Sequence, residues 1–174
     1  MKFTETPLKG AFVIELEPIE DNRGFFARTC ASGQFLQYGL ETHWVEFSTS
    51  FTKKEGTRRG MHYQAAPFAE DKLVRCTSGA IHDVIVDLRP PSPTFKQWYA
   101  VELTAKNRKQ LYVPKMFAHG FQTLEDNTEV FYQMSEFHHP EAAREIPCDS
   151  PGLKIVWPER NIWATIPTPL SHPW

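Results

Sequence analysis

A histidine and a lysine ten positions apart are the residues of this chain whose types and spacing could do chemistry. They are His62, in the strand-like segment 59–64, and Lys72, at the start of the apolar run 72–76. Side chains alternate between the two faces of an extended strand, so His62 shares its face with Gly60 and Gln64. If the two segments line one cavity, an imidazole base and an ammonium group converge there on one small molecule.

Cationic residues gather beside these apolar runs. Arg59, Lys72 and Arg75 lie close together in the sequence, and a buried charge without a partner is unfavourable. An anionic ligand such as a phosphate or diphosphate would resolve that penalty. Internal pairing with acidic residues is the alternative, and both interpretations stay open; the available acids are Glu46, Glu70, Asp71 and Asp83.

A second cationic group lies near the N-terminus, in the segment 21–26, where Arg23 and Gly24 precede Phe25 and Phe26. An arginine beside aromatic faces suits a nucleotide, through phosphate pairing and base stacking. The same residues are also typical of a hairpin turn with the phenylalanines in the core.

His119 and Tyr132 complete the set of candidates. The histidine spacing argues against a metal site, because the sequence contains no HxH, HxxxH or HExxH pattern even with His82 included. Tyr132 could donate a proton opposite His62, although a packed tyrosine is the commoner case. No nucleophile elbow, phosphate-binding loop or dinucleotide fingerprint occurs, so neither nucleophilic hydrolysis nor hydride transfer is supported.

The composition and charge of the whole chain limit the functions that these candidate residues could serve. Its 174 residues are 41% apolar and 13% aromatic, which indicates one ordered domain. The net charge of −2 and pI near 6.4 argue against nucleic-acid binding. We expect no signal peptide and no membrane span. The three cysteines form no CxxC pair, so we expect reduced thiols and a soluble cytoplasmic protein.

The elements that must position the candidates are mostly strands. Short β-like runs separated by turn residues predict an all-β sandwich or barrel. The expected strands are 45–51, 61–64, 73–76, 81–88, 98–103, 110–113, 117–123 and 130–134. Only Ser32–Tyr38 and Pro140–Arg144 look helical, and the proline-rich segment from Pro158 to Trp174 is expected to be extended.

Taken in order, these motifs resemble the dTDP-4-dehydrorhamnose 3,5-epimerase family. The resemblance runs from about residue 3 to residue 158. It rests on 21–26 (DNRGFF), 59–64 (RGMHYQ), 72–75 (KLVR), 79–89 (GAIHDVIVDLR), 92–94 (SPT), Pro114 with 117–121 (FAHGF), and 153–158 (LKIVWP).

The resemblance implies a single cupin-type jelly-roll domain over residues 1–174, with a few short helices. It also implies a homodimer that exchanges an N-terminal arm of about residues 1–28, and no metal or organic cofactor. The implied setting is deoxysugar or bacterial surface polysaccharide (lipopolysaccharide) biosynthesis.

The resemblance further implies roles for single residues. His62 is similar to the base that removes a proton next to a 4-keto group. Lys72 is similar to the residue that stabilises the enolate oxygen, and Tyr132 to the acid that returns a proton from the opposite face. The implied substrate-binding residues are Arg59, Arg23, Phe26, Gln64, His119, Glu46 and Ser48.

The chain departs from the family pattern at the site. The family aspartate expected after Trp157-Pro158 is missing, since no aspartate follows Asp149. Without its carboxylate an imidazole is less basic and less well oriented, and His172 or Asp83 could take that place. Other departures are Glu46-Phe47-Ser48 for Gln-x-Asn, Phe137-His138 for a tyrosine pair, and Arg58 for an apolar residue.

The sequence therefore predicts an epimerase of a nucleotide-linked 4-keto-6-deoxy sugar, acting at C3, C5 or both. The departures keep two alternatives open. One is a nucleotide-sugar-binding homologue that has lost turnover, and the other is a ketosugar isomerase on the same scaffold.

Overall fold

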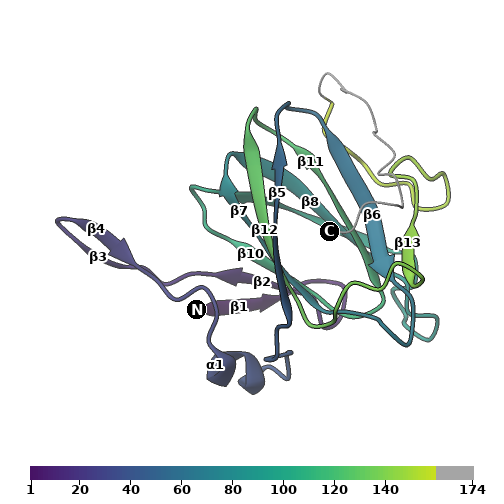
Figure 1. Cartoon of the computed structure of the whole chain (residues 1–174), viewed down its shortest axis with the longest axis horizontal. Helices are drawn as coiled ribbons and strands as arrows, with labels where there is room; N and C mark the ends of the chain where they lie inside the picture. Colours follow the sequence, from purple (N-terminus) through teal and green to yellow (C-terminus); the bar gives the residue numbers. More distant parts are fainter. Residues whose placement is uncertain (160–174) are drawn as a thin grey trace.

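Two antiparallel sheets facing each other make up the body of the protein, in a computed structural model that describes residues 1–159 (Figure 1). The six-stranded sheet has the order β1 (Lys2–Glu5), β2 (Phe12–Glu15), β10 (Gln110–Val113), β7 (Lys72–Ser78), β12 (Thr128–Met134), β5 (Glu46–Thr52). The five-stranded sheet has the order β13 (Ala143–Glu145), β6 (Arg58–Gln64), β11 (Phe117–Thr123), β8 (Ala80–Asp87), β9 (Trp98–Thr104). The predicted all-β jelly roll is confirmed.

The sheets are held together by alternate side chains of their facing strands. Val74 and Val130 come from the six-stranded sheet and meet Ile81, Ile85 and Phe121 from the other; all five are nearly or fully buried. Burying side chains of this size stabilises a fold by about 1.5–3 kcal/mol each. This core fixes the separation of the two sheets, and therefore the width of any cavity between them.

Strand β8 is buried on both faces. Ile81 and Ile85 point into the core between the sheets, whereas Val84 and Val86 pack in a second cluster with Leu153. The segment after β13 thus covers the outer face of the five-stranded sheet. This double coverage is why β8 carries consecutive apolar residues at 84–86 and not an alternating pattern there.

The eight predicted strands and the helix α1 (Ser32–Gln37) are present. The prediction of helix for Pro140–Arg144 is wrong, because the end of that segment forms β13. There Ala143 pairs with Gln64, and Glu145 pairs with His62. Edge pairing with β6 outweighed a weak helical pattern. The C-terminal extended segment was predicted for 158–174, and its residues 160–174 lie outside the described part.

A hairpin near the N-terminus projects away from the sheets (Figure 1). It consists of β3 (Ile19–Asp21) and β4 (Gly24–Phe26), which pair with each other alone. The rings of Phe25 and Phe26 are 47% and 60% exposed, so they are not core residues of this chain. In contrast, β1 pairs with β2, and β2 pairs with β10 of the same chain.

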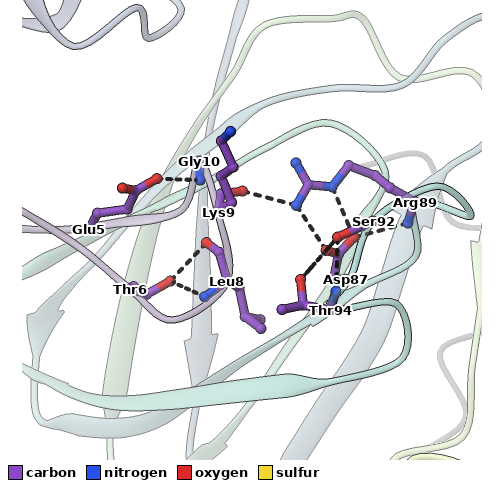
Figure 2. Close-up of polar contacts among 9 residues, drawn as sticks. All are labelled: Glu5, Thr6, Leu8, Lys9, Gly10, Asp87, Arg89, Ser92 and Thr94. Atoms are coloured by element: carbon purple, nitrogen blue, oxygen red, sulfur yellow. Dashed lines mark hydrogen bonds and ion pairs between the residues drawn. The ribbon is translucent and has the colours of Figure 1, made fainter.

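A buried carboxylate fastens the turn before β2 to the loop after β8 (Figure 2). Asp87 accepts hydrogen bonds from Arg89, Ser92 and Thr94 at 2.6–2.9 Å, and Arg89 also donates to the carbonyl of Lys9 at 2.9 Å. Burial raises the pKa of Asp87, but these donors outweigh it and hold the pKa well below its ordinary value.

No helix among residues 1–159 is both long and apolar enough to cross a membrane.

Candidate active site

A cavity of about 190 Å³ opens between the two sheets. Most of the residues predicted from the sequence to form a site line it. They are His62, Lys72, Tyr132, Arg59, Gln64, His119, Glu46 and Ser48. Side chains from β6, β7, β11, β12 and β5 therefore converge on one volume, and the two segments that carry His62 and Lys72 do line one cavity.

One wall of the cavity carries a row of three ionisable side chains. His62 lies on β6, His119 is its register partner on β11, and Glu145 is its partner on the other side, on β13. The Nε2 atom of His62 is 4.0 Å from Oε1 of Glu145. The row places a base between a second histidine and a carboxylate.

The strands β6 and β11 approach each other closely beside this row. A Cβ atom at Gly60 would lie 2.6 Å from the Cα atom of Gly120 and 2.7 Å from the carbonyl oxygen of His119. Gly60 also has φ +113°, a conformation that side chains strongly disfavour. The glycine before the histidine is thus required by backbone contact, and the register shift at this point sets how His62 sits relative to His119.

His62 is held neutral by its surroundings. Burial lowers its pKa to about 4, and the nearby charges of Lys72, His119 and Arg59 act in the same direction. An imidazole that is unprotonated at neutral pH has a free lone pair and can accept a proton.

His119 is anchored by a buried acid. Its Nε2 atom lies 2.7 Å from Oδ1 of Asp83, and both side chains are nearly or fully buried. The sequence left open whether Asp83 serves His62; the structure assigns it to His119.

Lys72 is paired inside the cavity. Its Nζ atom is 3.0 Å from Oε1 of Glu70, and the two side chains are 13% and 11% exposed. Glu70 in turn accepts a hydrogen bond from Nε2 of Gln64 at 3.1 Å. The Gln64 amide also donates to the carbonyls of Phe68 and Phe137, so its role in this structure is to orient Glu70.

Tyr132 faces the histidines from the opposite sheet. Its ring lies edge-on to the ring of His119, with centroids 6.4 Å apart. Burial raises the pKa of Tyr132 to about 12, against smaller opposing effects of Ser50 and Arg59. The phenol therefore keeps its proton at neutral pH and can act as a donor.

Arg59 bridges the two sheets at the rim of the cavity. Its guanidinium donates to Oγ1 of Thr52 at 2.9 Å and to the carbonyl of Phe51 at 3.3 Å. Within residues 1–159 no carboxylate forms an ion pair with it. Arg75 instead lies over the ring of Phe131. Of the predicted cation cluster, Lys72 is paired internally and Arg59 keeps donors for an anion.

The family of known proteins that matches this chain is described as dTDP-4-dehydrorhamnose 3,5-epimerase, over residues 5–171. The chain belongs to that family. An epimerase of that name from Methanothermobacter thermautotrophicus is 41% identical over 157 residues, covering 90% of this chain and 84% of the relative.

Two solved structures of the family have the same fold. The Bacillus anthracis enzyme with TDP and PPi bound has a TM-score of 0.89 at 39% identity, covering 92% of each chain. The Legionella pneumophila epimerase in complex with dTDP-4-keto-L-rhamnose has a TM-score of 0.85 at 34% identity, covering 90% of this chain and 83% of that one. Members of the family are isomerases.

Two of the predicted epimerase residues lie away from the cavity. Arg23 and Phe26 are on the projecting hairpin, where Arg23 pairs with Asp21 and both are exposed. They do not reach the site of their own chain.

Glu46 and Ser48 lie on β5 and line the cavity. Glu46 accepts a hydrogen bond from the backbone of His138 at 3.2 Å, and Ser48 is the register partner of Tyr132. Among residues 1–159 no three histidine, cysteine or acidic side chains are grouped so that they could hold a metal ion.

The sequence interpretation missed Glu145, because its segment was expected to end a short helix. The segment Ala143-Arg144-Glu145-Ile146 does not alternate between apolar and charged residues, so no local signal in the sequence identifies it as a strand.

Proposed function

We propose that this protein inverts C3, C5 or both in a dTDP-linked 4-keto-6-deoxy sugar. The observation that carries the proposal is that His62 and Tyr132 face one cavity from opposite sheets. A proton can therefore leave one face of a sugar carbon and a different proton can reach the other face. The family membership and the bound ligands named for its solved members support the substrate class.

The reaction follows from the groups in the cavity. Carbons 3 and 5 flank the ketone at C4, so removing their protons gives an enolate. Neutral His62 takes the proton and becomes imidazolium, while Lys72 stabilises the negative oxygen. The electron pair then returns to carbon, which takes the phenolic proton of Tyr132 from the opposite face. Exchange with water returns Tyr132 and His62 to their starting states.

The diphosphate is assigned to Arg59, whose free donors lie at the rim of the cavity. Arg23 and Phe26 would complete the nucleotide site from a second copy of the chain. The projecting hairpin supports this arrangement, because a two-stranded ribbon with exposed aromatic rings is marginal in water without a partner. We therefore propose a homodimer in which residues 19–26 cross to the neighbouring subunit.

We place the enzyme in the cytoplasm. The free thiols of Cys30, Cys76 and Cys148 support a reducing compartment.

Deuterium incorporation tests the function directly. The protein is incubated in D₂O with dTDP-, UDP- or CDP-linked 4-keto-6-deoxyglucose, and the sugar is examined by NMR. We expect label at C3 or C5 with the dTDP sugar, together with inverted product. Binding of the dTDP sugar without any label would contradict the proposal and favour a nucleotide-sugar-binding protein. Label without inversion would favour a different ketosugar isomerase.

A further inference from the structure

A carboxylate lies beside the base on the edge strand of the five-stranded sheet. Glu145 is the register partner of His62, its Oε1 atom is 4.0 Å from Nε2 of His62, and its side chain is 27% exposed. Both residues line the cavity. The backbone therefore fixes the carboxylate next to the imidazole, and a small side-chain rotation would bring the two into hydrogen-bonding distance.

The other acids around the cavity have partners of their own. Glu70 pairs with Lys72, Asp83 with His119, and Glu46 accepts from the backbone of His138. In the part of the chain that the structure describes, the Glu145 side chain has no hydrogen bond, and its ion-pair contact is with His62. It is thus the acid available to serve the base.

We infer that Glu145 is the positioning residue of His62, holding the imidazole in the tautomer that carries its proton on Nε2. The inference rests on the proposed function and deepens it.

The chemistry of imidazole gives this contact two consequences. A neutral ring has one N–H donor and one lone pair, so a proton on Nε2 directed at Glu145 leaves the lone pair on Nδ1 to accept the sugar proton. Once the proton is transferred, the ring is cationic. The charges facing it from β6, β7 and β11 belong to Arg59, Lys72 and His119, all of which oppose that cation. Glu145, on β13, is the group that offsets them, and such contacts commonly shorten when substrate binds.

The test compares Glu145→Gln and Glu145→Ala with a matched control. Glu102→Gln is that control. Glu102 lies on β9, the opposite edge strand of the same sheet, where it is the register partner of His82 and lies outside the cavity. We expect the rate of deuterium wash-in at the sugar to fall about 100-fold in both Glu145 variants, with KM changed less than about threefold. The control should match the wild type.

A spectroscopic readout separates this inference from the proposed function. The ¹⁵N shifts of the His62 ring at pH 7 report which nitrogen holds the proton. We expect the Nε2–H form to dominate in the wild type and in Glu102→Gln, and its population to fall in Glu145→Ala. Thermal unfolding of each variant confirms that it is folded.

The outcomes are distinct. If the wild type exchanges label, rates within about twofold of wild type in both Glu145 variants overturn the inference, whatever the tautomer. If the wild type exchanges nothing with any donor, the proposed function fails, and the ¹⁵N shifts alone decide. An unchanged tautomer then overturns the pairing of Glu145 with His62, and a changed one supports it.

Discussion

His62 and Tyr132 have pKa values displaced in opposite directions by the same cause. Burial disfavours the charged form of each side chain, so it lowers the pKa of the imidazole to about 4 and raises that of the phenol to about 12. At neutral pH both are uncharged, with the proton on the phenol and absent from one imidazole nitrogen. This is the state in which one group can accept a proton and the other can donate one.

Replacing these two residues separates exchange from inversion. His62→Asn removes the base, and we expect deuterium wash-in to fall by about 1,000-fold. Tyr132→Phe removes the donor but leaves the base, so label should still enter from the His62 side while inverted product falls by about 100-fold. NMR of the recovered sugar measures both quantities. Equal loss of exchange and inversion in Tyr132→Phe would contradict the division of roles.

The pKa of His62 also depends on its cationic neighbours. Lys72 disfavours the imidazolium, so Lys72→Met should raise the midpoint at which His62 titrates. The acid limb of any residual exchange should move to higher pH in the same direction. The NMR signal of His62 between pH 3.5 and 8 measures the midpoint, and Lys53→Met, at an exposed position, is the control. An unmoved or lower midpoint in Lys72→Met would contradict the assigned cause.

At the scale of elements, the contact between β6 and β11 sets the position of the base. Gly60→Ala should destabilise the fold by about 3 kcal/mol, because the new methyl group would collide with the backbone of Gly120 and the residue has positive φ. Urea unfolding measures the change. Gly152→Ala is the control, since a Cβ there meets nothing within 4 Å. A loss in Gly60→Ala no greater than in the control would show that the strands can separate without penalty.

The strands could be predicted from the sequence because their residues alternate or form apolar runs between clear turns. The predictions failed where pairing and not periodicity decides the structure. Residues 143–145 are a strand because β6 offers them an open edge, which no local pattern reveals. For the same reason the sequence identified His62 and Lys72 but not Glu145. Which acid serves which histidine depends on register, so Asp83 could be placed with His119 only from the structure.

At the scale of the whole molecule, the hydrogen bonds of Asp87 and Arg89 join the turn before β2 to the loop after β8. Asp87→Asn should lower the free energy of unfolding by about 3 kcal/mol at pH 7, because the partly buried Arg89 loses the charge of its buried acceptor. The folded-state pKa is depressed, so the stabilisation is complete above about pH 4 and is lost as pH falls further.

Denaturant titrations at pH 7 and in acid measure this difference, which should shrink in acid. Asp21→Asn is the matched control, since Asp21 forms an exposed pair with Arg23 at the same spacing. It should show no measurable loss. A pH-independent difference for Asp87→Asn would contradict the linkage.

The projecting hairpin makes a prediction about assembly. Replacing Phe25 and Phe26 with serine should weaken the homodimer and raise KM for the dTDP sugar by about tenfold. The substitution removes the two exposed rings that would pack against the partner subunit. Light scattering at micromolar concentration and substrate titration measure the two effects. Leu36→Ser, which alters a 70% exposed residue on α1, is the control. An unchanged assembly and KM would place the nucleotide site within one chain.

The placement of base and acid on separate sheets has a consequence for stereochemical fidelity. Neither His62 nor Tyr132 determines by itself whether a sugar carbon is inverted or only labelled. The distance between the two sheets that carry them determines it. Core side chains such as Val74 and Ile85 set that distance, although they are not among the residues that line the cavity. The ratio of inverted to relabelled sugar therefore reports the distance between the two sheets at the cavity. Substitutions that loosen the packing of the core should lower the ratio of inverted to relabelled sugar before they slow deuterium exchange.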